Sequence, residues 1–93
     1  MYSFEYKPNF KRDLKKLKNK GYDLGLLDEV FDLLAAGDSR TLIAKYKDHQ
    51  LKGNLKKYRE LHVLGDWLLV YRVSKSTMTL ILMDTGNHDH TLR

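Results

Sequence analysis

Aromatic residues alternate with polar ones at the start of the chain: Tyr2, Phe4 and Tyr6. A period of two is typical of a strand. After Pro8 the apolar residues stand at i, i+4 and i+7 instead: Phe10, Leu14 and Leu17. This spacing among lysines predicts an amphipathic helix that begins at Pro8, where a missing N–H costs nothing, and ends before Gly21.

A second stripe with helical spacing follows: Leu27, Val30, Phe31 and Leu34. Asp23 is placed to cap this helix and Gly37 to end it. Since the connection over residues 19–23 is short, the two helices are expected to form a hairpin. Residues 38–54 show no clean period and are predicted to be mostly loop.

From Lys57 onward the period returns to two. One face of the predicted strand carries Arg59, Leu61 and Val63. The other face carries Tyr58, Glu60 and His62. The apolar runs 67–73 and 78–83 predict two more strands, of which the first is buried on both faces. The order β-α-α-β-β-β predicts a single α+β domain over residues 1–93, with the helical hairpin covering one face of an antiparallel sheet.

The chain of 93 residues carries a net charge of +5, and its basic residues are clustered. One cluster lies in and around the first predicted helix: Lys7, Lys11, Arg12, Lys15, Lys16, Lys18 and Lys20. The other follows the second helix: Lys45, Lys47, Lys52, Lys56, Lys57 and Arg59. This segregation suggests a polyanionic partner, nucleic acid before membrane, although a solvated lysine-rich surface explains the charge alone equally well.

Composition excludes several kinds of chemistry. The chain has no cysteine, so disulfides, thiolate metal sites and cysteine nucleophiles are ruled out. No glycine pattern typical of nucleotide-binding loops or of serine hydrolases is present. The N-terminus lacks the apolar segment of a signal peptide, and no apolar run reaches membrane-spanning length. We therefore expect a cytoplasmic protein without membrane contact.

Three histidines are the strongest candidates for catalysis. His49 lies in a basic segment, His62 shares a strand face with Glu60, and His88 follows the last predicted strand. Antiparallel pairing can bring all three to one end of one sheet face, beside Asp66. RNA cleavage needs such a set, because the 2′-hydroxyl must lose a proton and the leaving 5′-oxygen must gain one.

Basic and aromatic side chains near these histidines are candidates for RNA binding. Lys47, Lys52 and Arg59 can offset the negative charge that develops on the phosphoryl oxygens. Tyr58 or Trp67 can stack on a base, although a core position for Trp67 is the commoner outcome.

A metal site is the competing use of the histidines. His88 and His90 are separated by one residue and have Asp84 and Asp89 nearby. Their spacing matches no strong zinc pattern, so neither a metal nor another cofactor is predicted.

Four motifs resemble those of a known family: Tyr46-Lys47-Asp48-His49-Gln50-Leu51-Lys52-Gly53, Tyr58-Arg59-Glu60-Leu61-His62, Asp66-Trp67-Leu68-Leu69-Val70-Tyr71 and Thr85-Gly86-Asn87-His88. Their order and spacing are similar to those of YafQ-type toxins of the RelE superfamily. The resemblance implies a toxin of a type II toxin–antitoxin pair, acting as a ribosome-dependent endoribonuclease on mRNA. It also implies a small acidic antitoxin, bound in a heterotetramer or larger assembly.

The resemblance implies roles for individual residues as well. His49, His62 and His88 match active-site histidines of the family. Asp66 matches its acidic residue, Trp67 the neighbouring aromatic, and Glu60 an acidic position beside the site. In a mechanism with these roles, His49 or Asp66 helps to deprotonate the 2′-hydroxyl, His62 orients the phosphate, and His88 protonates the leaving oxygen.

Two departures from the family pattern keep other functions open. The family usually has arginine directly before Thr-Gly-x-His, where this chain has Asp84, and an aromatic soon after the late histidine, where it has Thr91 and Leu92. A carboxylate repels phosphate where a guanidinium would clamp it. A catalytically weakened protein that still binds antitoxin or ribosome is therefore an alternative. A ParE-like gyrase inhibitor is less favoured, because the histidine set would have no use there.

Overall fold

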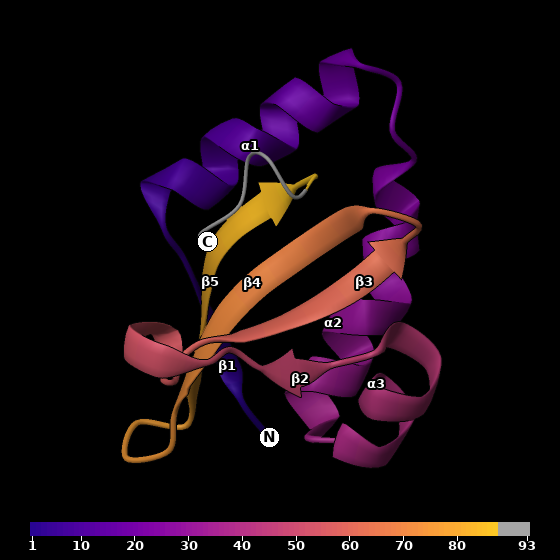
Figure 1. The fold of residues 1–93 in the computed structure, drawn as a ribbon. Helices are drawn as coiled ribbons and strands as arrows, with labels where there is room; N and C mark the ends of the chain where they lie inside the picture. Colours follow the sequence, from indigo (N-terminus) through magenta and orange to yellow (C-terminus); the bar gives the residue numbers. More distant parts are fainter. Residues whose placement is uncertain (88–93) are drawn as a thin grey trace.

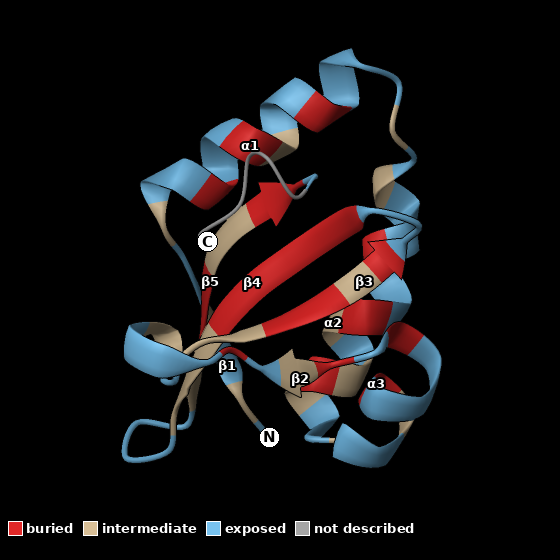
Figure 2. Ribbon diagram, in the orientation of Figure 1, coloured by how far each residue is buried: buried red, intermediate tan, exposed pale blue. Residues whose placement is uncertain are grey.

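The computed structural model describes residues 1–87 and has the α+β architecture expected from the sequence pattern (Figure 1). Five strands form one sheet in the order β1-β5-β4-β3-β2. Their bounds are Ser3–Tyr6 (β1), His49–Gln50 (β2), Arg59–Leu64 (β3), Trp67–Ser74 (β4) and Thr79–Gly86 (β5). The central place of β4 explains its continuous apolar run, because a strand with neighbours on both sides and burial on both faces has no solvent side (Figure 2).

Strands β3, β4 and β5 form the predicted antiparallel meander. The sheet is nevertheless mixed, because β1 lies outside β5 and pairs with it in parallel, with Phe4 opposite Leu80. Parallel neighbours need a long crossover, and here the whole chain between β1 and β5 provides it. The edges of the sheet are thus the N-terminal strand and the two-residue strand β2.

Three helices supply apolar side chains to one face of the sheet: α1 (Pro8–Asn19), α2 (Leu27–Ala36) and α3 (Ser39–Tyr46). Helix α1 begins at Pro8 as expected, and it buries Phe10 and Leu17. Gly37 ends α2 in the left-handed conformation, with φ 70°, that glycine adopts without strain. No helix within residues 1–87 is long and apolar enough to cross a membrane.

The helices meet different partners. Helix α1 packs along β5, whereas α2 packs on α3, so the first two helices do not pair as the simple hairpin expected from their short connection. Asp23 caps a 3-10 turn over Leu24–Leu26, accepting from the N–H of Gly25 at 3.0 Å, and α2 begins only after that turn. The core between helices and sheet contains Phe10, Leu17, Leu27, Val30, Leu34, Leu42, Tyr46, Leu61, Val63, Trp67, Leu69, Tyr71, Leu80 and Leu82.

The prediction that residues 38–54 are mostly loop is wrong. Asp38 caps α3 by accepting from the N–H of Thr41 at 3.1 Å, and Leu42 and Tyr46 are the buried side of this helix. The helix has only two turns, so its apolar stripe is too short to show a period in the sequence. Strand β2 is shorter still and exists only because β3 pairs with it.

A bulge in β5 determines which of its late residues face the core. Val70 pairs with Asp84 and Tyr71 with Leu82, so Met83 is an extra residue without a partner in β4. The extra residue shifts the alternation by one position. As a result Thr85 is buried and hydrogen-bonded within the core, whereas Asp84 lies on the same sheet face as Val70.

Candidate active site

One row of residues crosses four strands on the sheet face opposite the helices. His49 of β2 pairs with Glu60 of β3, Glu60 with Val70 of β4, and Val70 with Asp84 of β5. His62 lies one position further along the same face as Glu60, because strand residues two apart point to the same side. The sheet thus gathers two histidines and two carboxylates that the sequence separates by up to 35 residues.

His49 is held from both sides of its ring. Its Nδ1 lies 2.8 Å from the carbonyl oxygen of Lys47 and its Nε2 lies 3.4 Å from Oε1 of Glu60. A carbonyl oxygen only accepts hydrogen bonds, so Nδ1 is the donor in this contact and Nε2 is the nitrogen that faces Glu60. The side chain of His49 is 43% exposed whereas that of Glu60 is fully buried, so the imidazole is the member of the pair that a ligand can reach.

His62 has the same arrangement at the other strand end. Its Nδ1 lies 3.1 Å from the carbonyl oxygen of Gly65, in the turn between β3 and β4, so Nδ1 is likewise the donor in this contact. The ring centroids of His62 and His49 are 6.4 Å apart. Asp66 is exposed in the same turn as Gly65, between β3 and β4.

A buried polar group lies on the helix side of the sheet, directly behind His49. Asp48 is 6% exposed, and its Oδ1 accepts a 2.8 Å hydrogen bond from the Tyr71 hydroxyl. Its Oδ2 lies 3.3 Å from Nε of Arg59. Burial, and then the negative charge of Asp48, raises the pKa of Tyr71 well above its ordinary value. Burial opposes the charge on Arg59, but Asp48 and Tyr71 outweigh it and raise the pKa of Arg59.

Two residues predicted to bind RNA, Trp67 and Arg59, make contacts within the protein instead. Trp67 is 3% exposed, packs edge-on against Tyr22 with centroids 5.2 Å apart, and donates from Nε1 to Oγ1 of Thr85 at 2.9 Å. It is a core residue, so the predicted stacking of a base on Trp67 is at odds with the structure. Arg59 points to the helix side and pairs with Asp48, so it does not share the face of His49.

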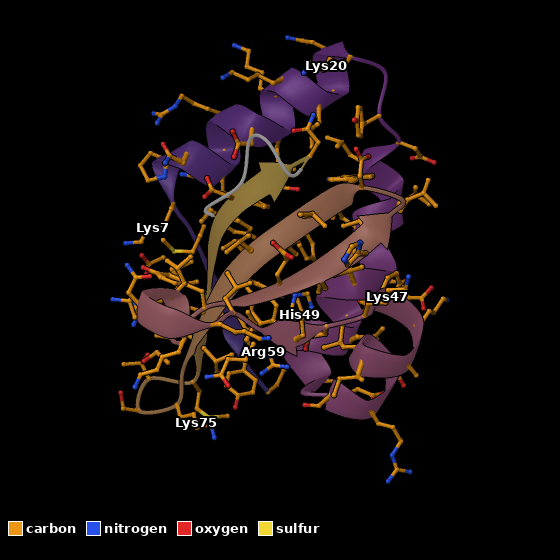
Figure 3. The ribbon with its side chains drawn as sticks, in the orientation of Figure 1. Lys7, Lys20, Lys47, His49, Arg59 and Lys75 are labelled. Atoms are coloured by element: carbon orange, nitrogen blue, oxygen red, sulfur yellow. The ribbon has the colours of Figure 1, made fainter. Side chains whose placement is uncertain are left out.

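The remaining basic and aromatic candidates belong to the segments before and after β2, and Figure 3 labels Lys47 together with His49. Lys47 is exposed and precedes Asp48, with its carbonyl oxygen on the His49 ring. Lys52 is exposed and, with His49 and three neighbouring residues, lines a hollow of about 330 Å³. Tyr58 is half-buried, with the ammonium of Lys57 5.4 Å from its ring centroid. His88 lies outside the described residues, as does His90.

Sequence reasoning missed Asp48, Tyr71, Asp13 and Thr85 as buried polar residues. A signal was present for two of them. A tyrosine inside a strand buried on both faces needs a partner for its hydroxyl. Asp13 stands three residues after Phe10, on the apolar side of an otherwise lysine-rich helix, and it accepts from the backbone N–H of Thr85 at 3.2 Å.

The sequence of the chain matches that of known toxins along almost its entire length. Residues 2–93 match the family model described as "Bacterial toxin of type II toxin-antitoxin system, YafQ". The mRNA interferase toxin YafQ of Escherichia coli K12 is 33% identical over 84 residues, which cover 90% of this chain and 88% of that protein. The chain belongs to the YafQ toxin family. It is thus a toxin of the type II toxin–antitoxin class, related to an mRNA interferase.

Solved structures of YafQ-family toxins and related proteins share the fold. A metal-bound toxin from Helicobacter pylori is 45% identical, covers 96% of this chain and 97% of its own, and superposes with a TM-score of 0.84. YafQ in the E. coli DinJ–YafQ complex is 32% identical, covers 96% of both chains, and has a TM-score of 0.81. Within residues 1–87 of the present chain, no group of three or more histidine or carboxylate side chains is arranged to hold a metal ion.

Proposed function

We propose that this YafQ-family protein cleaves mRNA on the ribosome in the cytoplasm, without a metal ion. The observation that carries the proposal is the pair of half-buried histidines on one sheet face, His49 and His62, whose Nδ1 atoms are both bonded to backbone carbonyls. Each ring then presents Nε2 for proton transfer, and an imidazole changes charge near neutral pH. Family membership and the relative named as an mRNA interferase support the same reaction.

The proposed chemistry is a transfer within the RNA backbone. The 2′-hydroxyl loses its proton to a histidine or to Asp66 while the 2′-oxygen bonds to the adjacent phosphorus. The bond from phosphorus to the 5′-oxygen breaks, and that oxygen takes a proton. The products are a 2′,3′-cyclic phosphate and a 5′-hydroxyl, with no oxidant or water consumed.

Each step of this reaction is assigned to particular residues. His49 acts at Nε2, where Glu60 stabilises the imidazolium that forms after proton uptake. His62 orients the phosphate, and His88 protonates the leaving 5′-oxygen, as the family resemblance suggests. Lys47 and Lys52 offset phosphate charge, and the hollow beside His49 has room for one nucleobase between Leu51 and Leu55.

The proposal is tested by inducing the wild type, His49→Ala, His62→Ala and His88→Ala in a bacterial host and mapping mRNA 5′ ends. We expect growth arrest with codon-phased cuts in the wild type and at least a hundredfold loss in each variant, on the order of the contribution of a general acid or base. Lys75→Ala, in the exposed turn after β4, is the control and should cut normally. Purified protein should cut ribosome-bound mRNA in the presence of a chelator that removes transition metals but leaves Mg²⁺.

A weakened toxin is the second candidate, and Asp84 is the observation that favours it. This carboxylate lies in the same cross-strand row as His49 and Glu60, where it repels a phosphate. Wild-type protein that binds its antitoxin but neither arrests growth nor cuts mRNA would support this candidate. DNA damage with intact mRNA would instead indicate a gyrase inhibitor.

We further propose an acidic antitoxin as the partner of α1, in a heterotetramer or larger assembly. Four exposed lysines of this helix and a fifth at its C-cap lie apart from His49 (Figures 2 and 3): Lys11, Lys15, Lys16, Lys18 and Lys20. YafQ of E. coli has been solved in complex with DinJ. Replacing Lys11, Lys15 and Lys18 by glutamate should weaken binding of the acidic protein encoded beside the gene and remove most of its salt dependence. Lys75→Glu is the matched control, and equal effects of the two changes would contradict the assignment.

A further inference from the structure

His49 sits at a part of the chain that has little support of its own. Strand β2 has two residues, lies at the edge of the sheet, and has β3 as its single neighbour. A short edge strand is held by few backbone hydrogen bonds and is among the first parts of a sheet to open. Contacts outside β2 must therefore help to hold the ring of His49 beside Glu60.

Asp48, directly before His49 in the chain, is the residue best placed to make these contacts. Neighbouring strand residues point to opposite faces, so Asp48 enters the helix side of the sheet while His49 lies on the other. Its two carboxylate oxygens reach two different strands, Tyr71 of β4 at 2.8 Å and Arg59 of β3 at 3.3 Å. Its backbone N–H donates to the carbonyl of Leu42 in α3 at 3.2 Å.

The backbone conformation of Lys47, the residue before Asp48, shows that contacts with the rest of the protein hold the chain in place here. Lys47 ends α3 in the left-handed conformation, with φ 55° and ψ 35°, which costs a side-chain-bearing residue free energy. This turn is what brings the carbonyl oxygen of Lys47 onto Nδ1 of His49 at 2.8 Å. Contacts on Asp48 immediately after the turn hold the chain in it.

We propose that Asp48, bonded to Tyr71 and Arg59, is a positioning residue that fixes the orientation and the Nδ1–H tautomer of His49. It touches neither RNA nor the reacting atoms in this scheme, and it acts through the backbone of residues 47–49. The catalytic part of the inference rests on the proposed ribonuclease activity, whereas the part about the His49 ring does not.

The first test is spectroscopic and needs no activity. Long-range ¹H–¹⁵N spectra of the imidazole rings, with His49 assigned by His49→Ala, report which ring nitrogen carries the proton. In the wild type at pH 8 we expect protonated Nδ1. In Tyr71→Phe and in Asp48→Ala the signal should move toward the Nε2–H tautomer that dominates in a free histidine, and Asp48→Asn, which still accepts from Tyr71, should lie in between.

Tyr46→Phe is the matched control for Tyr71→Phe. It also removes the hydroxyl of a buried tyrosine that interacts with a carboxylate, in this case Glu29 of α2. It should leave the His49 signal unchanged. Equal spectra for Tyr71→Phe and Tyr46→Phe, in folded proteins, would overturn the proposal.

The second test measures cleavage of a ribosome-bound model mRNA. Tyr71→Phe should lower kcat on the order of tenfold to a hundredfold, because a misplacement of about 1 Å has such an effect, while KM stays unchanged. Asp48→Asn should retain more activity than Asp48→Ala. A shifted His49 signal with unchanged kcat would overturn the catalytic part, and a wild type that cuts no mRNA would contradict the proposed function while leaving the spectroscopic result to decide the positioning.

Discussion

The indole N–H of Trp67 donates a 2.9 Å hydrogen bond to Oγ1 of Thr85, and that hydroxyl donates in turn to the carbonyl of Leu68 at 2.8 Å. The backbone N–H of Thr85 donates to Asp13 of α1 at 3.2 Å. Thr85 thus joins the central strand, the last strand and the first helix at one buried point. This point lies just before Gly86 and Asn87, where the chain leads to His88.

Replacing Trp67 by phenylalanine separates a core role from a role in binding RNA. We expect a loss of about 2–4 kcal/mol in the free energy of unfolding, because the change removes core volume and leaves the Thr85 hydroxyl with one partner fewer. Urea unfolding measures the loss, and cleavage per folded molecule should stay within about threefold of the wild type. A selective loss of cleavage at unchanged stability would show that Trp67 contacts RNA after all.

Tyr71 should make the protein sensitive to alkali. Its folded-state pKa is raised above the ordinary value of 10, so its contribution to stability is complete below pH 10. That contribution is lost as pH rises above 10 toward the folded-state pKa, because the unfolded chain releases the proton first. Unfolding by urea between pH 9 and pH 11, at steps of about half a unit, should show this decline. Tyr71→Phe should flatten it, whereas Tyr46→Phe should leave most of it.

Lys47→Gly should stabilise the fold, by up to about 1 kcal/mol, because glycine adopts the left-handed conformation without the strain of a side chain. Ala44→Gly is the matched control with the opposite expected sign, since residue 44 lies inside α3. There the same replacement should destabilise by about 1 kcal/mol. Thermal unfolding of both variants gives the comparison, and a destabilising effect of Lys47→Gly would mean that the lysine side chain contributes packing that outweighs the strain.

Asp84→Arg should raise the rate of mRNA cleavage by tenfold or more, since one well-placed charge contact to a phosphoryl group contributes about 2 kcal/mol or more to transition-state stabilisation. The physical reason is the row that places residue 84 on the face of His49 and Glu60. Asp84→Asn removes the repulsion without adding a cation, so it separates the two effects. If neither variant cleaves mRNA faster than the wild type, the phosphate of the RNA does not bind beside residue 84.

Local patterns in the sequence were enough for most of the framework. Pro8 begins the first helix, Gly37 ends the second, and the apolar run from Trp67 belongs to the central strand. The alternation in β3 also placed Glu60 and His62 on one face, because the period of a strand is a property of its own backbone. Family membership was readable in the four motifs, and the comparisons confirm it.

Only the tertiary structure decided what each polar residue does. The bulge at Met83, which turns Asp84 outward and Thr85 inward, exists in the pairing of β5 with β4 and leaves no mark in either strand alone. Asp48, directly before β2, meets Arg59 of β3 and Tyr71 of β4, and the indole N–H of Trp67 is bonded to Thr85 within the core. Hydrogen bonds of buried polar groups join residues far apart in the chain, so local periodicity predicts where a strand lies but not which distant atom satisfies its side chains.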